Sequence, residues 1–276
     1  LHIHNYCSIA SLGLDYMITK GVFDECFKVS GVIQQFIQKC VVGGRCMTRD
    51  NKKWNVDSIL SDFDSVSEYP SAMNRMEGIL KGTPTVIEED NLNFEWLEEN
   101  TDGYFIKCIA LNDPTIKRDF PLLSCKGEDG IRNFSNEVKG KVFYIDKTTY
   151  EDAKEFQGIN FKIICGYYFN EGRNNKINAV IRHLFNQRVK MKAEGNPIQS
   201  VYKLLMNSCY GKCLLKPIDS ETKIVTEKDW DKYLNRNYNF IINAYPLNDK
   251  IHLVKEQKPI NTHYNIVHAG VEILSM

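Results

Sequence analysis

Two amphipathic segments joined by a short turn constrain the fold of this chain more than any other feature. In "KINAVIRHLFNQRVKMK" the apolar residues recur at helical spacing, at Ile177, Val180, Ile181, Leu184 and Phe185. The turn "AEGN" follows, in which Asn196 is a good helix N-cap and Pro197 suits a first helical turn. A second helix is expected to run to Tyr210, with Gly211 as its C-terminal cap. The pattern predicts an antiparallel helical hairpin.

The hairpin is expected to have a buried face and a working face. The expected buried residues of the second helix are Val201, Leu204, Leu205 and Ser208. The opposite face carries Lys203, Asn207 and Tyr210, and the first helix adds the cations Arg188 and Lys192. Three cations are better suited to binding a triphosphate than to pairing with a single carboxylate. A pair of basic helices exposed to solvent would show the same pattern, so this alternative stays open.

Charge is distributed unevenly although the net charge is zero. From Asp57 to Asp102 there are twelve acids and two bases, whereas from Glu171 to Lys216 there are nine bases and two acids. The two stretches could be solvated faces of opposite sign. The alternative is an acidic element that holds metal ions and a basic element that binds phosphates.

Composition is that of an ordinary globular protein, with 276 residues, 43% hydrophobic and 25% charged. The chain has no run of about 18 apolar residues that would span a membrane and no signal-peptide pattern at its start. Its nine cysteines include no CxxC pair, so reduced thiols inside a cell are expected and a zinc site is not. Because the chain starts without methionine and stops on the apolar "VEILSM", we expect a fragment.

The region before residue 83 shows one helix signal and one strand signal. Apolar residues at helical spacing predict a helix over 31–41. A glycine pair follows at Gly43 and Gly44, which permits close approach of a ligand. The first part of "SILSDFDSVSEYPSAMNRM" favours a strand that ends at Pro70.

The middle of the chain, residues 83–170, is interpreted as an inserted α+β subdomain. Strands are expected over 104–111, 141–145 and 161–169. A short helix over 147–158 is expected to be capped by Thr148 or Thr149.

Three motifs occur in the order found in family B DNA polymerases. "KLLMNSCYG", Lys203 to Gly211, fits Kx3NSxYG and resembles motif B of that family. "DSVSEYPS", Asp64 to Ser71, resembles motif A, and "FNQRVKMK", residues 185–192, is similar to the first helix of the fingers. The stretch "HYNIVHAGVEILSM", 263–276, is similar to the sequence that precedes the last catalytic strand in viral members of the family.

The resemblance implies a fragment of the α+β right-hand polymerase fold, with a palm, an inserted subdomain and fingers made of the helical hairpin. It implies five segments: 1–50, the end of the exonuclease–palm connection with a GG-containing template loop; 51–82, the palm with motif A; 83–170, the inserted subdomain; 171–214, the fingers with motif B; and 215–276, the return to the palm before motif C.

The implied activity is DNA-directed DNA polymerisation in DNA replication, by transfer of a dNTP to the 3′-hydroxyl of a primer on a DNA template. Two Mg²⁺ ions would stabilise the attacking and leaving oxygens. By resemblance, Asp64 is the metal-binding carboxylate and the Ser65 carbonyl is a second oxygen ligand. Asp62 is expected to be a supporting acid, because only Asp64 aligns with motif A.

The resemblance also implies the nucleotide and DNA contacts. The nucleotide-binding residues would be Ser67, Glu68, Tyr69, Arg188, Lys192, Lys203 and Asn207. Main-chain N–H groups near Ser67 and Glu68 would hold phosphates, Tyr69 would exclude a ribose 2′-hydroxyl, and Lys203 would act catalytically on the leaving pyrophosphate. The DNA-binding residues would be Gly43, Gly44, Arg45, Tyr210 and Gly211.

"VVGGR", Val41 to Arg45, is similar to the YxGG region of protein-primed members, although Val41 replaces the tyrosine. Protein priming would add a terminal protein as a partner beside primer–template DNA and dNTP, because the insertion contacts both in those polymerases. A viral or selfish-element origin fits this subgroup, with work at a viral replication site or in the host cytoplasm or nucleus.

Two features depart from the family. Glu68 stands where the family has leucine, which puts the fine placement of the triphosphate in doubt. Residues 213–276 contain no match to motif C, which carries the second catalytic aspartate, so the fragment is not expected to polymerise by itself.

Two other functions remain open from the sequence. One is a non-catalytic, nucleic-acid-binding remnant of a polymerase. The other is a metal-dependent glycosyltransferase that uses Asp62 and Asp64 as a DxD motif, a hypothesis that leaves the "NSCYG" helix unexplained.

Overall fold

The computed structural model describes residues 4, 6–27, 29–65, 67–127, 130–215, 220–257 and 266–276. The chain forms two compact units, one of Leu1–Leu214 with Ile266–Met276 and one of Leu215–Asn265. Residues 215–276, expected as a single return segment, therefore contribute to both units. Among the described helices, none is long and apolar enough to cross a membrane.

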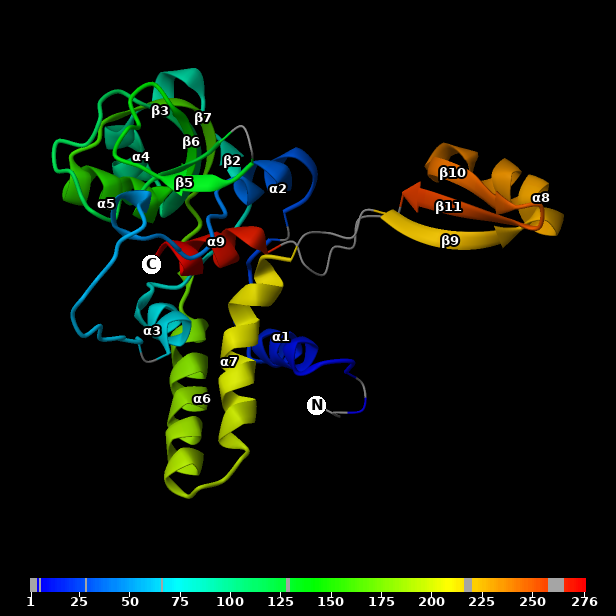
Figure 1. The fold of residues 1–276 in the computed structure, drawn as a ribbon, viewed down its shortest axis with the longest axis horizontal. Coiled ribbons are helices and arrows are strands. Elements are labelled where there is room, and N and C mark those ends of the chain that lie inside the picture. Colours follow the sequence, from blue (N-terminus) through cyan, green and yellow to red (C-terminus); the bar gives the residue numbers. More distant parts are fainter. Residues whose placement is uncertain are drawn as a thin grey trace. The chain divides into compact units, whose positions relative to one another are not determined.

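A four-stranded antiparallel sheet organises residues 85–169 of the larger unit (Figure 1). In spatial order its strands are β2 (Thr85–Val86), β7 (Phe161–Phe169), β3 (Gly103–Ala110) and β6 (Val142–Asp146). The three strands expected here are confirmed. One sheet face packs its alternate side chains, among them Ile106 and Cys108, under α4 (Phe94–Asn100) and α5 (Lys147–Gln157). A short 3₁₀ turn, η3 (Glu89–Asn91), and a small hairpin, β4 (Ser124–Lys126) and β5 (Arg132–Phe134), complete this region.

The cap of α5 differs from the expectation. Asp146, and neither Thr148 nor Thr149, is the N-cap, and its carboxylate accepts hydrogen bonds from the backbone N–H of Thr149 at 3.2 Å and from its hydroxyl at 2.5 Å. Strand β6 leads directly into the helix, so both threonines lie inside the first turn and the last strand residue becomes the cap.

The helical part of the larger unit contains the expected hairpin. It consists of α6 (Lys176–Ala193) and α7 (Gln199–Cys213), with α1 (Ile9–Thr19) along α7 and α3 (Glu68–Arg75) along α6. A shared apolar core fills the space between them, and it includes Met17, Met73, Ile177, Ile181, Leu184, Met206 and Cys209. The antiparallel hairpin is therefore confirmed.

The end and the buried face of α7 were predicted wrongly. The helix continues past Gly211 to Cys213, because Cys213 is buried in the helical core and extends the helix by a further half turn. The buried stripe passes through Met206 and Cys209, while Leu204 is 47% exposed. The reason is that α7 packs on α6 and α1 at once: Gly13 of α1 approaches it so closely that a Cβ there would lie 3.3 Å from the Leu205 carbonyl oxygen.

The strand expected before Pro70 is also absent from the described residues. The chain from 52 to 65 is irregular and exposed, with Ile59 96% and Phe63 90% exposed. A strand needs a hydrogen-bonded neighbour, and the described part of the chain places none beside this segment. Regular structure resumes with α3, whose first turn holds Pro70 where no helical hydrogen-bond donor is needed.

One buried helix joins the sheet region to the helical region. The helix α9 (Val267–Ser275) buries seven consecutive residues, Val267 to Ile273, between the sheet, α2 (Gly31–Gln38) and α7 (Figure 1). Arg173 holds it there. The guanidinium donates to Glu272 at 2.7 Å, to the Gly78 carbonyl at 2.8 Å and to the Asp102 carbonyl at 2.7 Å. These bonds connect β8 (Arg173–Asn174) and its partner β1 (Ile79–Leu80) to α9 and to the start of β3.

The smaller unit is a three-stranded antiparallel sheet with one helix. Its strand order is β10 (Ile241–Asn248), β11 (Ile251–Gln257) and β9 (Ser220–Thr226), and α8 (Glu227–Asn237) packs on β9 and β11, followed by the 3₁₀ turn η4 (Tyr238–Phe240). Trp230 of α8 stacks on His252 of β11, with ring centroids 4.1 Å apart.

We predict that Arg173→Met destabilises the protein by about 3–5 kcal/mol, because it leaves the buried Glu272 carboxylate without its cation. The double change Arg173→Met with Glu272→Met should recover most of that loss, since no buried charge is then left unpaired and the other partner, Glu77, is exposed. Urea unfolding followed by circular dichroism measures both. The exposed Lys162→Met is the matched control, and an equal loss in the single and double variants would contradict a buried ion pair.

We also predict a loss of stability in acid that depends on His268. Burial lowers the pKa of this ring from 6.5 to about 4, so below pH 6.5 the unfolded chain binds a proton that the folded chain does not. Stability should fall by up to about 3 kcal/mol as pH drops from 6.5 to 4. His268→Phe keeps the stacking on Phe169 and should remove this component. Comparing the two proteins by urea unfolding at each pH cancels the opposite effect of Glu272, whose pKa burial raises to about 7. An unchanged pH profile in the variant would count against the prediction.

Candidate functional site

The helix α3 lies against α6 through polar contacts at both of its ends. Arg188 of α6 donates from Nη1 to the Ser67 hydroxyl at 2.7 Å. Nearer the start of α6, the Asn178 amide donates to the carbonyl oxygens of Asn74 at 2.9 Å and Met76 at 2.8 Å, at the other end of α3. The two contacts hold α3 along α6 at both of its ends.

Ser67 and Arg188 both have features typical of a ligand site. Ser67 has φ 55° and ψ 52°, a left-handed backbone that costs a non-glycine residue about 1–3 kcal/mol and persists only where surrounding contacts enforce it. The Nε of Arg188 is buried and has no hydrogen-bond partner among the described residues. A buried donor without an acceptor is costly, so this guanidinium is suited to an anionic ligand that supplies one.

Two tyrosines from these elements stack on each other. The rings of Tyr69 in α3 and Tyr210 in α7 have centroids 4.2 Å apart and an angle of 24° between their planes. Burial raises the pKa of Tyr210, and the neighbouring Tyr69 adds to the shift, so the phenol stays neutral at physiological pH. The stack is a flat aromatic surface next to the Ser67–Arg188 contact.

Glycine leaves room beside this stack. A Cβ on Gly44 would lie 3.9 Å from the Tyr69 hydroxyl, while Gly43 and Gly211 would each meet no atom within 4 Å. The structure therefore brings Ser67, Tyr69, Arg188, Tyr210 and Gly44 together, although they come from four separate segments of the sequence.

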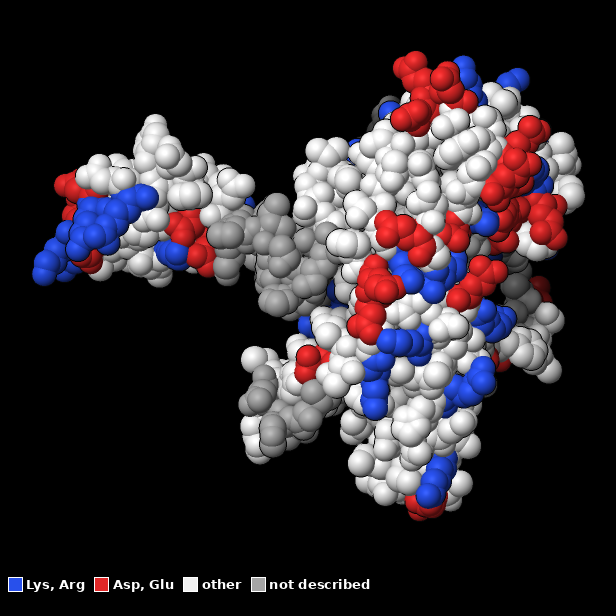
Figure 2. All heavy atoms as spheres, turned by 180° about the vertical axis from the view of Figure 1, so that it is seen from behind, with Lys and Arg blue, Asp and Glu red and all other residues white. Residues whose placement is uncertain are grey.

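The other expected nucleotide contacts lie around this group on the two long helices. Lys192 and Lys203 are exposed, Asn207 and Gly211 are half-buried, and neither lysine forms an ion pair with a described residue. On the face drawn in Figure 2, Lys and Arg side chains are scattered along the α6–α7 end of the larger unit, whereas Asp and Glu gather over the sheet end.

The expected metal ligands are not assembled into a cluster. Asp64 and Ser65 are exposed in the irregular segment that precedes α3, and no group of three His, Cys, Asp or Glu in the described residues could hold a metal ion. A single carboxylate with a neighbouring carbonyl suits a Mg²⁺ ion only if phosphates and water complete its shell.

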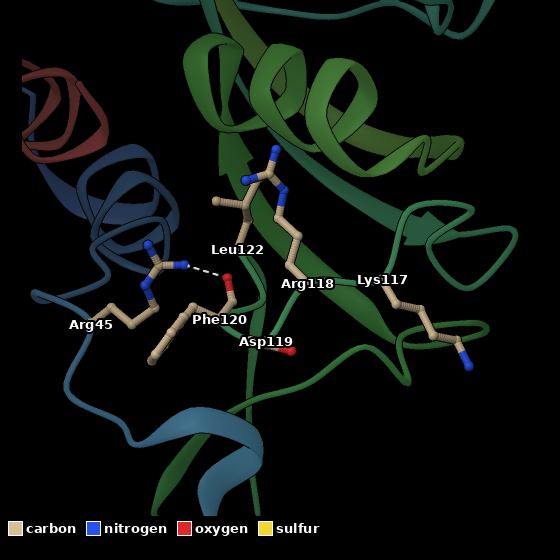
Figure 3. A pocket seen from close by; sticks show the side chains of 6 residues that line it. All are labelled: Arg45, Lys117, Arg118, Asp119, Phe120 and Leu122. Atoms are coloured by element: carbon tan, nitrogen blue, oxygen red, sulfur yellow. Dashed lines mark hydrogen bonds between the residues drawn. The ribbon is translucent and has the colours of Figure 1, made fainter. Parts of the chain in front are cut away.

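Glu68, the departure from the family motif, is the first residue of α3 and is exposed. An acid in the first turn is favoured by the helix dipole, which accounts for its tolerance there. Arg45, expected at the template, donates to the carbonyl oxygens of Phe120 at 2.7 Å (Figure 3) and Pro121 at 2.9 Å; its contact with a template stays a prediction.

Sequence patterns did not single out Asn178 or the left-handed conformation of Ser67. A sequence pattern assigns no particular contact to an asparagine inside a helix. The left-handed conformation of a serine cannot be recognised from the residues around it. The contact of Asn178 with the end of α3 becomes visible only once α3 and α6 are placed side by side.

Similarity to known proteins identifies the family of this chain. The family model described as DNA polymerase type B, organellar and viral, matches residues 1–273. A probable DNA polymerase of Ascobolus immersus is 26% identical over 235 residues, which is 85% of this chain and 18% of that protein. A DNA polymerase of Acidianus bottle-shaped virus is 41% identical over 56 residues, or 19% of this chain and 9% of that protein.

Solved structures share the fold. Phi29 DNA polymerase complexed with primer-template DNA superposes with a TM-score of 0.60 at 18% identity, covering 98% of this chain and 43% of that chain. Its complex with primer-template DNA and incoming nucleotide gives 0.57 at 18% identity, covering 98% and 44%. The chain thus spans less than half of the length of each of these relatives. With a family model matched along nearly all of its residues, this chain belongs to the type B DNA polymerases of the organellar and viral kind.

Proposed function

We propose that this chain supplies the nucleotide-binding part of a DNA-directed DNA polymerase, which transfers a dNTP to a primer 3′-hydroxyl under direction of a DNA template. The hydrogen bond between Ser67 and Arg188 carries the proposal most directly. These residues are 121 positions apart, yet they join the segment that resembles motif A to the basic helical hairpin that resembles motif B.

The hairpin residues would bind the triphosphate. Arg188 has a buried donor to offer, and Lys192 and Lys203 are exposed on the same two helices without competing carboxylates among the described residues. Backbone N–H groups of Ser67 and Glu68, at the start of α3, would add donors to phosphate oxygens. Lys203 would offset the charge that develops on the leaving pyrophosphate.

The stacked tyrosines would select the sugar and the base pair. Tyr69 would lie under the sugar, where its ring leaves no room for a 2′-hydroxyl, and Asn207 would pack beside the nucleotide. Tyr210, Gly211 and the Gly43–Gly44 pair present a flat ring and bare backbone, which suit contact with a base pair and the template.

Asp64 and Ser65 would hold the Mg²⁺ that accompanies the nucleotide. Bound magnesium would supply charge stabilisation for phosphoryl transfer, with two ions in the complete enzyme. The exposed position of Asp64, free of ion pairs with described residues, is compatible with that role.

The partners follow from the family. Phi29 DNA polymerase was solved with primer-template DNA and incoming nucleotides, and we propose primer–template DNA and dNTP as the partners of this chain. A terminal protein primer remains a prediction from the "VVGGR" segment. All nine cysteines are free thiols, which supports work inside a cell or organelle. The names palm (51–82), insertion (83–170) and fingers (171–214) are likewise proposals for these segments.

A nucleic-acid-binding remnant without chemistry is the second candidate, because no group of three His, Cys, Asp or Glu among the described residues could hold a metal ion. Family membership argues against the glycosyltransferase hypothesis. Primer extension by the full-length protein, with Asp64→Asn as its negative control, separates the polymerase from the remnant.

We predict that Arg188→Ala and Lys203→Ala each weaken binding of dNTP with Mg²⁺ by about tenfold or more, because each removes a charge-assisted contact to phosphate. Isothermal titration on this chain measures the affinity. Lys190→Ala is the matched control, since Lys190 is also exposed on α6 but points away from Arg188. Wild-type affinity in both test variants would remove the basis of the proposal.

We further predict that Tyr69→Ala narrows the preference for dNTP over rNTP by about tenfold, which corresponds to about 1.4 kcal/mol. The ring is the group proposed to exclude the 2′-hydroxyl. Tyr69→Phe keeps the ring and its stacking on Tyr210 and should retain the preference. Competition binding with matched dNTP and rNTP reads the ratio, and an unchanged ratio in the alanine variant would reject the sugar gate.

A further inference from the structure

One side chain of α6 holds the C-terminal end of α3. The amide of Asn178 donates to the carbonyl oxygens of Asn74 at 2.9 Å and Met76 at 2.8 Å, and at 3.4 Å to that of Met73. The last carbonyl groups of a helix have no donor within the helix itself. An amide NH₂ group carries two N–H bonds, so it can serve several such acceptors at once. Asn178 thus supplies the donors that the end of α3 needs.

The helix α3 depends on its neighbours for its position. It has only eight residues, Glu68–Arg75, and a helix of about two turns is not stable by itself in water. Its residue Met73 is fully buried in the helical core together with Ile177 and Ile181 of α6. Apolar packing has no preferred direction, whereas a hydrogen bond constrains both a distance and an angle. The polar contacts therefore fix where α3 lies along α6.

The polar contacts at the two ends of α3 are matched in spacing. Asn178 and Arg188 are ten positions apart on α6, and their partners Met76 and Ser67 are nine positions apart on α3. At a rise of about 1.5 Å per residue, these spacings correspond to about 15 Å and about 13.5 Å. The two helices lie side by side and run in opposite directions (Figure 1). Two separate contacts therefore set the register between them.

The backbone of α3 connects its two ends. The Ser71 N–H donates to the Ser67 carbonyl at 2.9 Å, and the Met76 N–H donates to the Ala72 carbonyl at 3.0 Å. Because these bonds tie successive turns together, a displacement of the C-terminal carbonyls moves the whole helix. Tyr69 belongs to the first turn of α3 and would move with it. Binding sites are sensitive to displacements of about 1 Å, so a small shift would alter the space that the Tyr69 ring leaves.

The same contact supports the strained backbone of Ser67. A left-handed conformation with φ 55° and ψ 52° persists at a serine only where the surrounding structure enforces it. Arg188 binds the Ser67 hydroxyl, and the fixed helix α3 holds the chain that follows. Without Asn178 the helix could shift and Ser67 could relax. The N–H groups proposed to bind phosphates would then change direction.

We propose that Asn178 is a positioning residue of the nucleotide site and contributes to the selection of deoxyribose over ribose. It holds the C-terminal end of α3 and thereby sets where Tyr69 lies at the other end. The inference rests on the proposed function, because that function assigns the sugar contact to Tyr69. Asn178 acts through α3 and has no contact of its own with the nucleotide.

The test is the ratio of dNTP affinity to rNTP affinity, measured on this chain by competition binding with Mg²⁺. Asn178→Leu keeps the size of the side chain but removes its donors, and it should narrow the ratio by about threefold or more. Asn178→Ala, which favours the helix, should have the same effect and serves if the leucine variant folds poorly. Loss of folded protein lowers the capacity for both nucleotides equally, so a purely structural role would leave the ratio unchanged.

The matched control is Asn186→Leu, the same change at an exposed asparagine about two turns further along α6. It should keep the wild-type ratio. A second control, Ile163→Val, removes a methyl group from the buried sheet core and costs about 1 kcal/mol of stability without touching α3. It should also keep the ratio, which separates positioning from a general loss of stability.

A double variant shows whether Asn178 acts through Tyr69. In Tyr69→Ala the ring that α3 positions is missing, so adding Asn178→Leu should change the ratio by less than about twofold. Two independent contributions would instead multiply, and the ratio would narrow by a further threefold or so. That further loss overturns the proposal. A wild-type ratio in both Asn178→Leu and Asn178→Ala overturns it as well.

The outcome can be separated from the fate of the proposed function. If the wild type prefers dNTP and Tyr69→Ala narrows the preference, but neither change at Asn178 does, the nucleotide site stands and the positioning role is rejected. If the wild type binds no dNTP, or binds dNTP and rNTP equally, the proposed function fails and the positioning role fails with it.

Discussion

A single buried guanidinium determines how the larger unit is assembled. Arg173 is largely withdrawn from water, and its donors are satisfied by Glu272, the Gly78 carbonyl and the Asp102 carbonyl. A buried charge is tolerated only with such partners, so β8, β1, the start of β3 and α9 must meet at this point. Because α9 is buried on all sides from Val267 to Ile273, its position in turn fixes where the sheet and the helical core approach each other.

The geometry of the candidate site depends on the position of these elements around Arg173. α6 begins three residues after Arg173 and carries both residues that hold α3, Asn178 near its start and Arg188 three turns later. The strained backbone of Ser67 is kept in place between them. One helix thus positions the segment that resembles motif A against the segment that resembles motif B, and the tyrosine stack follows from the same placement.

Much of the fold was predictable because it depends on local patterns. The strands of the sheet and the two hairpin helices follow from period-two and helical spacing of apolar residues. The errors arose where a neighbouring segment decided the outcome. The stretch before Pro70 has a strand pattern but no partner strand among the described residues, and α7 extends past Gly211 because Cys213 is buried. Asp146, and not Thr148 or Thr149, is the N-cap of α5, because a strand runs directly into this helix.

By itself the sequence determined the family and the helical hairpin, and it predicted the residue types of a nucleotide site, because motif spacing and side-chain chemistry can be read directly from the order of residues. Only the tertiary structure decided that Ser67 meets Arg188, that Tyr69 stacks on Tyr210 and that Arg45 is bound to the loop at Phe120. These contacts join residues from distant segments. They depend on which partners the buried charges find and on which apolar surfaces pack together across the whole unit. No local sequence pattern specifies these pairings.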